Sequence, residues 1–173
     1  MRRVDRSALV PYSPEEMFRL VDDVAAYPEF LPWCSDAVIE QEEGETMIAT
    51  LELHKGGISR RFTTRNTRKP YSAIDLSLVG GPFRHLSGGW RFRELGRDAG
   101  EAGCKVSLEL GFAFDSRLVD MMFGPFFEET CKSLVDAFTR RAAALDSADS
   151  AQFGSYHQLI KLDKFRYKDS KRQ

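Results

Sequence analysis

The sequence has few of the residues that usually carry catalysis or hold metals. It contains three cysteines and three histidines in 173 residues. The cysteines, Cys34, Cys104 and Cys131, are odd in number and far apart, which argues against a disulfide framework or a zinc knuckle and favours a reducing compartment. No HExxH, GxSxG, GxxxxGK[ST] or CxxC motif occurs. We therefore predict no catalytic residue, no metal site and no cofactor.

Long apolar runs and an excess of one charge are also missing. No apolar stretch approaches the roughly 20 residues of a membrane-spanning helix. Asp5, Arg6 and Ser7 interrupt the apolar run that a signal peptide requires. We expect a cytoplasmic protein that makes at most peripheral contact with the inner membrane. The net charge of −1 provides no general attraction to nucleic acid, so we expect no DNA binding, and any RNA or headgroup contact needs a local patch.

The N-terminal half begins with a strand and a short helix. Residues 3–12 alternate in polarity as a strand does. Ser13 has the features of an N-cap, with Pro14 in the first turn and Glu16 at the capping-box position. A helix is therefore expected to run from this point to about residue 24.

The rest of the sequence predicts a sheet followed by a long helix. Between residues 36 and 115 the apolar period changes to two, and glycine-rich turns separate short strands, as in an antiparallel meander. Gly56-Gly57 is expected to close a hairpin, and Gly88-Gly89 suggests a bulge. From residue 127 apolar residues recur at steps of three and four, which predicts a helix to about 145. We expect one α+β domain over 1–145 and a polar, weakly basic, flexible tail over 146–173.

An aromatic, proline-stiffened segment follows the first helix. Residues 24–34 read VAAYPEFLPWC and carry a single charge. Pro28 and Pro32 interrupt any long helix there. Exposed Tyr, Phe and Trp faces are costly in water, so the segment either plugs the core or guards the mouth of an apolar pocket.

Three motifs together resemble the coenzyme Q-binding START-domain family. They are YPEFLPWC, HKGGISRRFTTR and GPFFEETCKSLVDAFTRRA. That family belongs to the START-like, or polyketide cyclase, superfamily, and its bacterial members include ribosome association toxins. The resemblance covers residues 1–145 and implies a helix-grip fold, in which a curved antiparallel sheet wraps around a long C-terminal helix with an apolar cavity between them.

The candidate cavity residues come from the aromatic segment, one strand and the start of the long helix. They are Tyr27, Phe30, Leu31, Trp33, Phe112, Phe114, Leu118, Met121, Met122, Phe126 and Phe127. Aromatic rings could stack on a quinone, Tyr or Trp could donate to its carbonyl, and methionines suit a flexible isoprenoid tail. The alternative for each residue is ordinary core packing.

A basic hairpin is the second candidate site. It contains Lys55, Arg60, Arg61, Arg65, Arg68 and Lys69. These residues could contact phosphate of ribosomal RNA or of lipid headgroups. The alternative, a solvated outer face of the sheet, is the more common meaning of such a run of charges.

Three functions remain open from the sequence. The first is a non-enzymatic carrier that binds a hydrophobic small molecule, and the resemblance implies ubiquinone or a similar polyprenyl lipid. The second is a ribosome association toxin that binds the large ribosomal subunit and blocks subunit joining. The third is a polyketide cyclase or aromatase, which requires polar groups inside the cavity.

Overall fold

The computed structural model describes residues 1–96 and 103–169, with side chains described up to residue 149. Its elements are β1 (Arg2–Val10), α1 (Pro14–Asp22), the 3-10 turn η1 (Val24–Ala26), α2 (Tyr27–Phe30), β2 (Cys34–Glu43), β3 (Thr46–Lys55), β4 (Ile58–Lys69), β5 (Ala73–Gly80), β6 (Phe83–Glu94), β7 (Cys104–Phe114) and α3 (Arg117–Asp169). This order is the one that the sequence pattern predicts.

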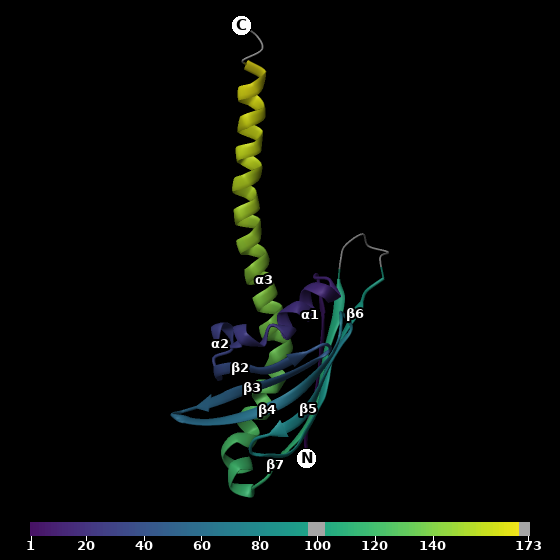
Figure 1. Ribbon diagram of the computed structural model, residues 1–173, viewed down its shortest axis with the longest axis vertical. Coiled ribbons are helices and arrows are strands. Elements are labelled where there is room, and N and C mark those ends of the chain that lie inside the picture. The colour runs from purple at the N-terminus through teal and green to yellow at the C-terminus, as the bar shows by residue number, and fades with distance from the viewer. Residues whose placement is uncertain (97–102, 170–173) are drawn as a thin grey trace. The chain divides into compact units, whose positions relative to one another are not determined.

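All seven strands form one antiparallel sheet. The strand order is β1-β7-β6-β5-β4-β3-β2, so six strands form a meander and β1 pairs with the last of them. One face of the sheet carries the buried apolar residues, as the alternation along β7 illustrates. Figure 1 shows the curved sheet with α3 crossing it. The α+β class and the helix-grip fold are thus confirmed.

Helix α1 begins as its sequence predicts. The Ser13 side chain accepts a hydrogen bond from the Glu16 backbone, and the Glu16 side chain accepts one from the Ser13 backbone. These reciprocal bonds satisfy two of the amides that a helix start leaves without partners. The aromatic segment, by contrast, is not all loop, because Tyr27–Phe30 forms the single helical turn α2. Pro28 is compatible with this turn, since the first residues of a helix need no amide donor.

Glycines are needed at one turn and at one close approach of two strands. Gly56 and Gly57 have φ values of 54° and 82°, which suit the tight turn that joins β3 to β4. The predicted bulge at Gly88-Gly89 is wrong, because the register shift lies between Phe83 and His85. Gly88 has another role: a β-carbon there would lie 2.1 Å from the Glu109 carbonyl oxygen.

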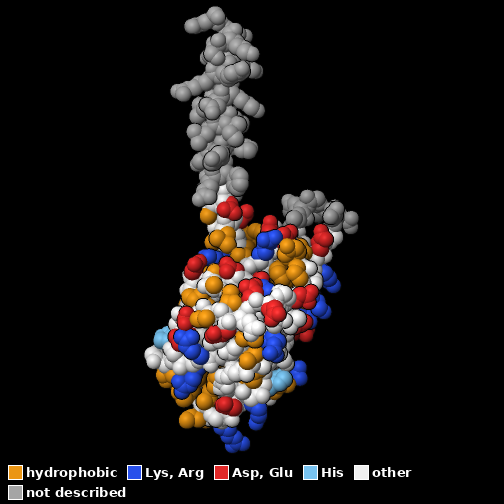
Figure 2. Space-filling model, in the orientation of Figure 1, with side chains coloured by type: hydrophobic (Ala, Val, Ile, Leu, Met, Phe, Trp, Pro, Cys, Tyr) orange, Lys and Arg blue, Asp and Glu red, His pale blue; other side chains and the backbone are white. Residues whose placement is uncertain are grey.

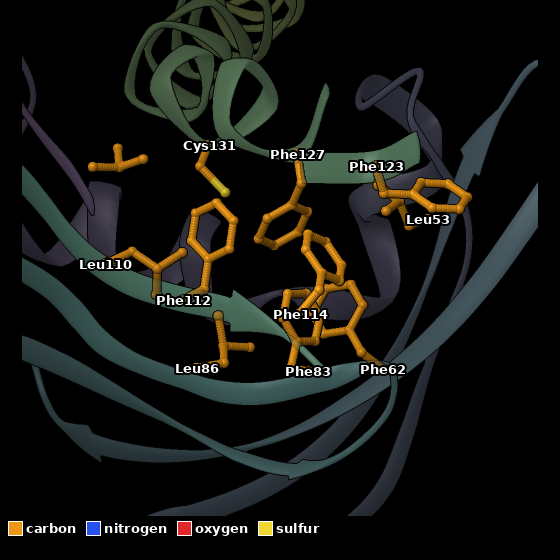
Figure 3. Packing of buried hydrophobic residues seen from close by; sticks show 11 residues of the cluster. Leu53, Phe62, Phe83, Leu86, Leu110, Phe112, Phe114, Phe123, Phe127 and Cys131 are labelled. Carbon is orange, nitrogen blue, oxygen red and sulfur yellow. The ribbon is translucent and has the colours of Figure 1, made fainter. Parts of the chain in front are cut away.

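Aromatic side chains join α3 to the concave face of the sheet. The Phe127 ring centroid lies 4.8 Å from that of Phe112 and 5.2 Å from that of Phe83. Phe62 and Phe114 complete the contacts around it, at 5.7 and 6.0 Å. Figure 3 shows the α3 side chains pointing toward the rings of the sheet. This cluster is the core of the grip.

The N-terminal strand also contacts α3 through charge. The Arg2 guanidinium bonds Asp120 at 3.1 Å and Glu128 at 2.9 Å. Gly124 lies between these acids on the same helix face, and a β-carbon there would meet the guanidinium at 2.7 Å. The hydrogen bonds from Arg2 are the main reason that the pKa of Asp120 is lowered.

The long helix extends beyond the end that the sequence predicts for it. Helix α3 continues to Asp169, past residue 146, where the sequence indicates a polar linker. The chain divides into two compact units, residues 1–139 and 140–173. The side chains from 150 onward lie outside the described residues, so a flexible tail over 146–173 stays a prediction.

Candidate functional site

A narrow apolar cavity lies between the concave face of the sheet and α3. Its volume is about 80 Å³, and α1, η1, α2, the central strands and α3 all contribute to its wall. Among the described lining residues there is no Asp, Glu, His, Lys or Arg. The cavity therefore has the chemistry of an apolar binding site and lacks charged groups for acid–base work.

Part of the predicted ligand site lies at this cavity. Tyr27, Trp33 and Phe127 line it. Phe112 and Phe114 are buried in the cluster around Phe127 and do not line the cavity. Leu31 is also buried, and Phe30 is half-buried with its ring 5.3 Å from that of Phe138 on α3.

The start of α3 contributes less to the site than the sequence suggests. Leu118 and Met121 are 68% and 77% exposed and lie outside the cavity wall, contrary to the prediction. Met122 and Phe126 are half-buried beside the aromatic cluster and do not line the cavity. Helical spacing puts Leu118 and Met121 away from the side that buries Phe123 and Phe127. Spacing alone could not tell which side meets the sheet.

The Tyr27 hydroxyl is already hydrogen-bonded, and the nearby Cys34 and Cys131 thiols are unreactive. Tyr27 donates its hydroxyl proton to the Val21 carbonyl oxygen, and burial raises its pKa. It is therefore not free to donate to a ligand carbonyl. Burial raises the pKa of the Cys34 thiol to about 11 and also raises the pKa of Cys131, which lines the cavity. Both thiols stay protonated near neutral pH and are poor nucleophiles.

Two polar cavity residues were missed from the sequence. Thr64 and Asn66 on β4 line the cavity and are only 8% and 7% exposed. The Thr64 hydroxyl donates to the Asn66 side-chain oxygen at 2.8 Å. Strand alternation places both on the face that buries Phe62, and this signal could have identified them.

Several basic side chains of the predicted site already form ion pairs within the protein. Arg68 is 9% exposed and contacts Asp22 and Glu42, so it is unavailable for an external phosphate. Arg61 pairs with Asp36 and Glu52 at 2.8 and 3.1 Å.

The remaining cations of the hairpin fall into two groups. Lys55 lies over the Phe126 ring and donates to the Met122 carbonyl oxygen, and Arg60 lies over Phe123. Arg65 and Lys69 are exposed, and neither pairs with an acid among the described side chains. Figure 2 shows basic and acidic side chains interspersed over the visible face. The hairpin therefore offers a small basic patch of Arg65 and Lys69.

Residues 10–139 match the family described as polyketide cyclase/dehydrase and lipid transport. This match spans most of the chain. The chain belongs to this family. The chain is similar to the ribosome association toxin RatA of Vibrio cholerae, at 49% identity over 142 residues, which are 82% of this chain and 96% of that protein.

Two further similar proteins have lower sequence identity to this chain. The solved 18 kDa protein CC1736 from Caulobacter crescentus is 32% identical, has a TM-score of 0.66, and the match covers 85% of this chain and 99% of that one. The mitochondrial coenzyme Q-binding protein COQ10 homolog B of Xenopus laevis is 29% identical over 80% of this chain and 57% of its own length.

The described residues form neither a metal site nor a membrane-spanning helix. In residues 1–96 and 103–149, no group of three or more His, Cys, Asp or Glu residues gathers as a metal site does. None of the described helices combines the length and apolar character needed to cross a bilayer.

Proposed function

We propose that this protein associates with the ribosome, through the large subunit, as a binding protein and not as an enzyme. The observation that carries the proposal is the 49% identity to a ribosome association toxin along 96% of that protein. The coenzyme Q-binding relative is more distant, at 29%. The order of the two leading hypotheses from the sequence is therefore reversed. The uncharged cavity wall supports binding over cyclase chemistry.

The basic patch of Arg65 and Lys69 is the surface that we assign to ribosome contact. Both residues are exposed and lie at alternate positions of β4, on the face away from the cavity. Phosphate contacts by exposed Lys and Arg provide most of the salt-sensitive affinity for nucleic acid. Arg61 shares this face, but Asp36 and Glu52 neutralise it.

Reversing the charge of the patch should weaken ribosome association. We expect the double variant Arg65→Glu/Lys69→Glu to bind ribosomal subunits about tenfold or more weakly at physiological salt, with a shallower salt dependence, because two phosphate contacts are lost. Co-sedimentation measures this. The control is Arg3→Glu/Arg84→Glu, which reverses two exposed arginines elsewhere. An equal loss in both double variants, or no loss at Arg65/Lys69, would sink the assignment of this surface.

A second candidate function is the carriage of an apolar lipid in the cavity, with a polyprenyl quinone as the ligand. The apolar wall supports it. The present volume of about 80 Å³ is smaller than the roughly 150 Å³ of a cavity that admits benzene. A long-tailed ligand therefore requires the wall to move, and we expect the half-buried Trp33, which lies between α2 and β2, to be one of the side chains that move.

Native protein should then co-purify with lipid. We expect solvent extraction and mass spectrometry to find a polyprenyl quinone in roughly stoichiometric amount. Truncating Trp33 to Ala should lower the amount retained, whereas Leu118→Ala, at an exposed position, should not. Protein that is free of lipid after purification from quinone-producing cells would contradict the carrier function.

A further inference from the structure

Asn66 stands out in a cavity wall that is otherwise aromatic and aliphatic. Apart from aromatic side chains, Thr64 and Asn66 are the only described lining residues with a side-chain nitrogen or oxygen. Both lie on β4. Across the strands, Asn66 is flanked by Met47 and Leu76, and Thr64 by Ala49 and Leu78. A carboxamide can donate two hydrogen bonds and accept two, but these apolar surroundings provide few partners for it.

The hydrogen bond from Thr64 satisfies only one end of this carboxamide. The Thr64 hydroxyl occupies the Asn66 oxygen, while the amide nitrogen donates to no described residue. Every described side-chain nitrogen or oxygen that the protein encloses completely does have a partner. The amide nitrogen of Asn66 must therefore border open space, and on this face of β4 that space is the cavity.

We propose that the Asn66 amide anchors the carbonyl oxygen of an apolar ligand. This inference rests on the second candidate function, the binding of a small molecule in the cavity. A buried donor without an acceptor is unfavourable, and a ketone, quinone or ester oxygen removes that cost. A carboxylate ligand fits poorly, because the described wall has no cation to compensate its charge.

Of the other donors at the cavity wall, Tyr27 is engaged and two indoles can be separated from Asn66 by experiment. The Tyr27 hydroxyl is engaged with the Val21 carbonyl oxygen. Trp33 and Trp90 each present one indole N–H and also line the wall. They remain unchanged when Asn66 is replaced, so the contribution of Asn66 can be measured separately. They also provide fluorescence that reports on occupancy of the cavity.

Two probes of nearly the same shape test the anchor. Each is larger than the present cavity of about 80 Å³, so the binding of either requires the same movement of the wall as the binding of a long-tailed ligand. Acetophenone carries a carbonyl oxygen where 2-phenylpropene carries a methylene group. In Asn66→Leu, we expect the affinity for acetophenone to fall about tenfold relative to the affinity for 2-phenylpropene. The loss of one buried hydrogen bond to the carbonyl oxygen implies a change of this size. Thr64→Val should keep the wild-type ratio. In the wild type, acetophenone should also shift the side-chain amide signal of Asn66 in the ¹H–¹⁵N spectrum.

The possible failures are distinguishable. Binding of both probes with an unchanged ratio in Asn66→Leu, and an unmoved Asn66 signal, would overturn the anchor but leave cavity binding intact. A ratio altered as much by Thr64→Val as by Asn66→Leu would also overturn the role given to the amide. Failure of either probe to bind the wild type would contradict the cavity function together with the anchor. The wild-type amide signal decides the matter even if a variant does not fold.

Discussion

We expect Phe127→Ala to lower the free energy of unfolding by about 3 to 5 kcal/mol, the usual cost of removing a large buried ring. Phe127 is 3% exposed. Its ring contacts Phe62, Phe83, Phe112 and Phe114 from three strands. The truncation leaves these rings around a void that a rigid sheet cannot fill. Urea denaturation measures this loss. An unchanged dependence of the free energy of unfolding on urea concentration would show that the variant unfolds in the same way and is only less stable.

The matched control for this prediction lies on the same helix. Met121 is 77% exposed, so Met121→Ala should change the free energy of unfolding by no more than about 0.5 kcal/mol. This comparison also tests where α3 meets the sheet. Similar losses in both variants would mean that the start of α3 is buried, as the sequence first suggested, and would contradict the placement of Met121 on the surface.

The second large effect is expected at Arg68. Its guanidinium lies 2.7 Å from Glu42 and 3.3 Å from Asp22, and donates to the carbonyl oxygens of Gly44 and Glu45. Arg68→Met removes one partner from all these contacts. We expect a loss of about 3 kcal/mol at neutral pH, the low end for a broken buried ion pair, because Glu42 is half exposed. The control Arg61→Met, at an exposed pair, should cost less than about 1 kcal/mol.

The loss in free energy of unfolding that Arg68→Met causes should depend on pH. Burial raises the pKa of Asp22, and the charge of Arg68 opposes this rise. Without Arg68 the pKa of Asp22 rises further. A raised native pKa means that the ionised acid destabilises the folded state, so stability falls as pH rises through that pKa. The deficit relative to wild type should therefore be smaller at pH 4 than at pH 7. A deficit independent of pH would contradict the assigned contact with Asp22.

Local patterns were sufficient to predict most of the architecture. The capping box at Ser13 and Glu16 involves neighbours in sequence, and the alternation along β7 records a strand with one buried face. Both signals are local, so they can be read without knowing the fold. The hairpin turn at Gly56-Gly57 is of the same kind.

The residues that were misplaced depend on contacts between distant parts of the chain. Arg68 resembles the other cations of its hairpin, but it lies on the buried face of β4, where Asp22 and Glu42, 46 and 26 residues away, contact it. Leu118 and Met121 are apolar at helical spacing, but they lie on the side of α3 away from the buried Phe123 and Phe127. Asn66 was overlooked although alternation with Phe62 and Thr64 marks the buried face of β4, and only the presence of a cavity there depends on how α3 closes the concave face.

The most direct test of ribosome association is sedimentation of the unaltered protein through a sucrose gradient with separated ribosomal subunits at physiological salt. We expect the protein to travel with the large-subunit fraction and not with the small. Protein that stays at the top of the gradient with both subunits present would contradict ribosome association and leave the apolar cavity as the functional site.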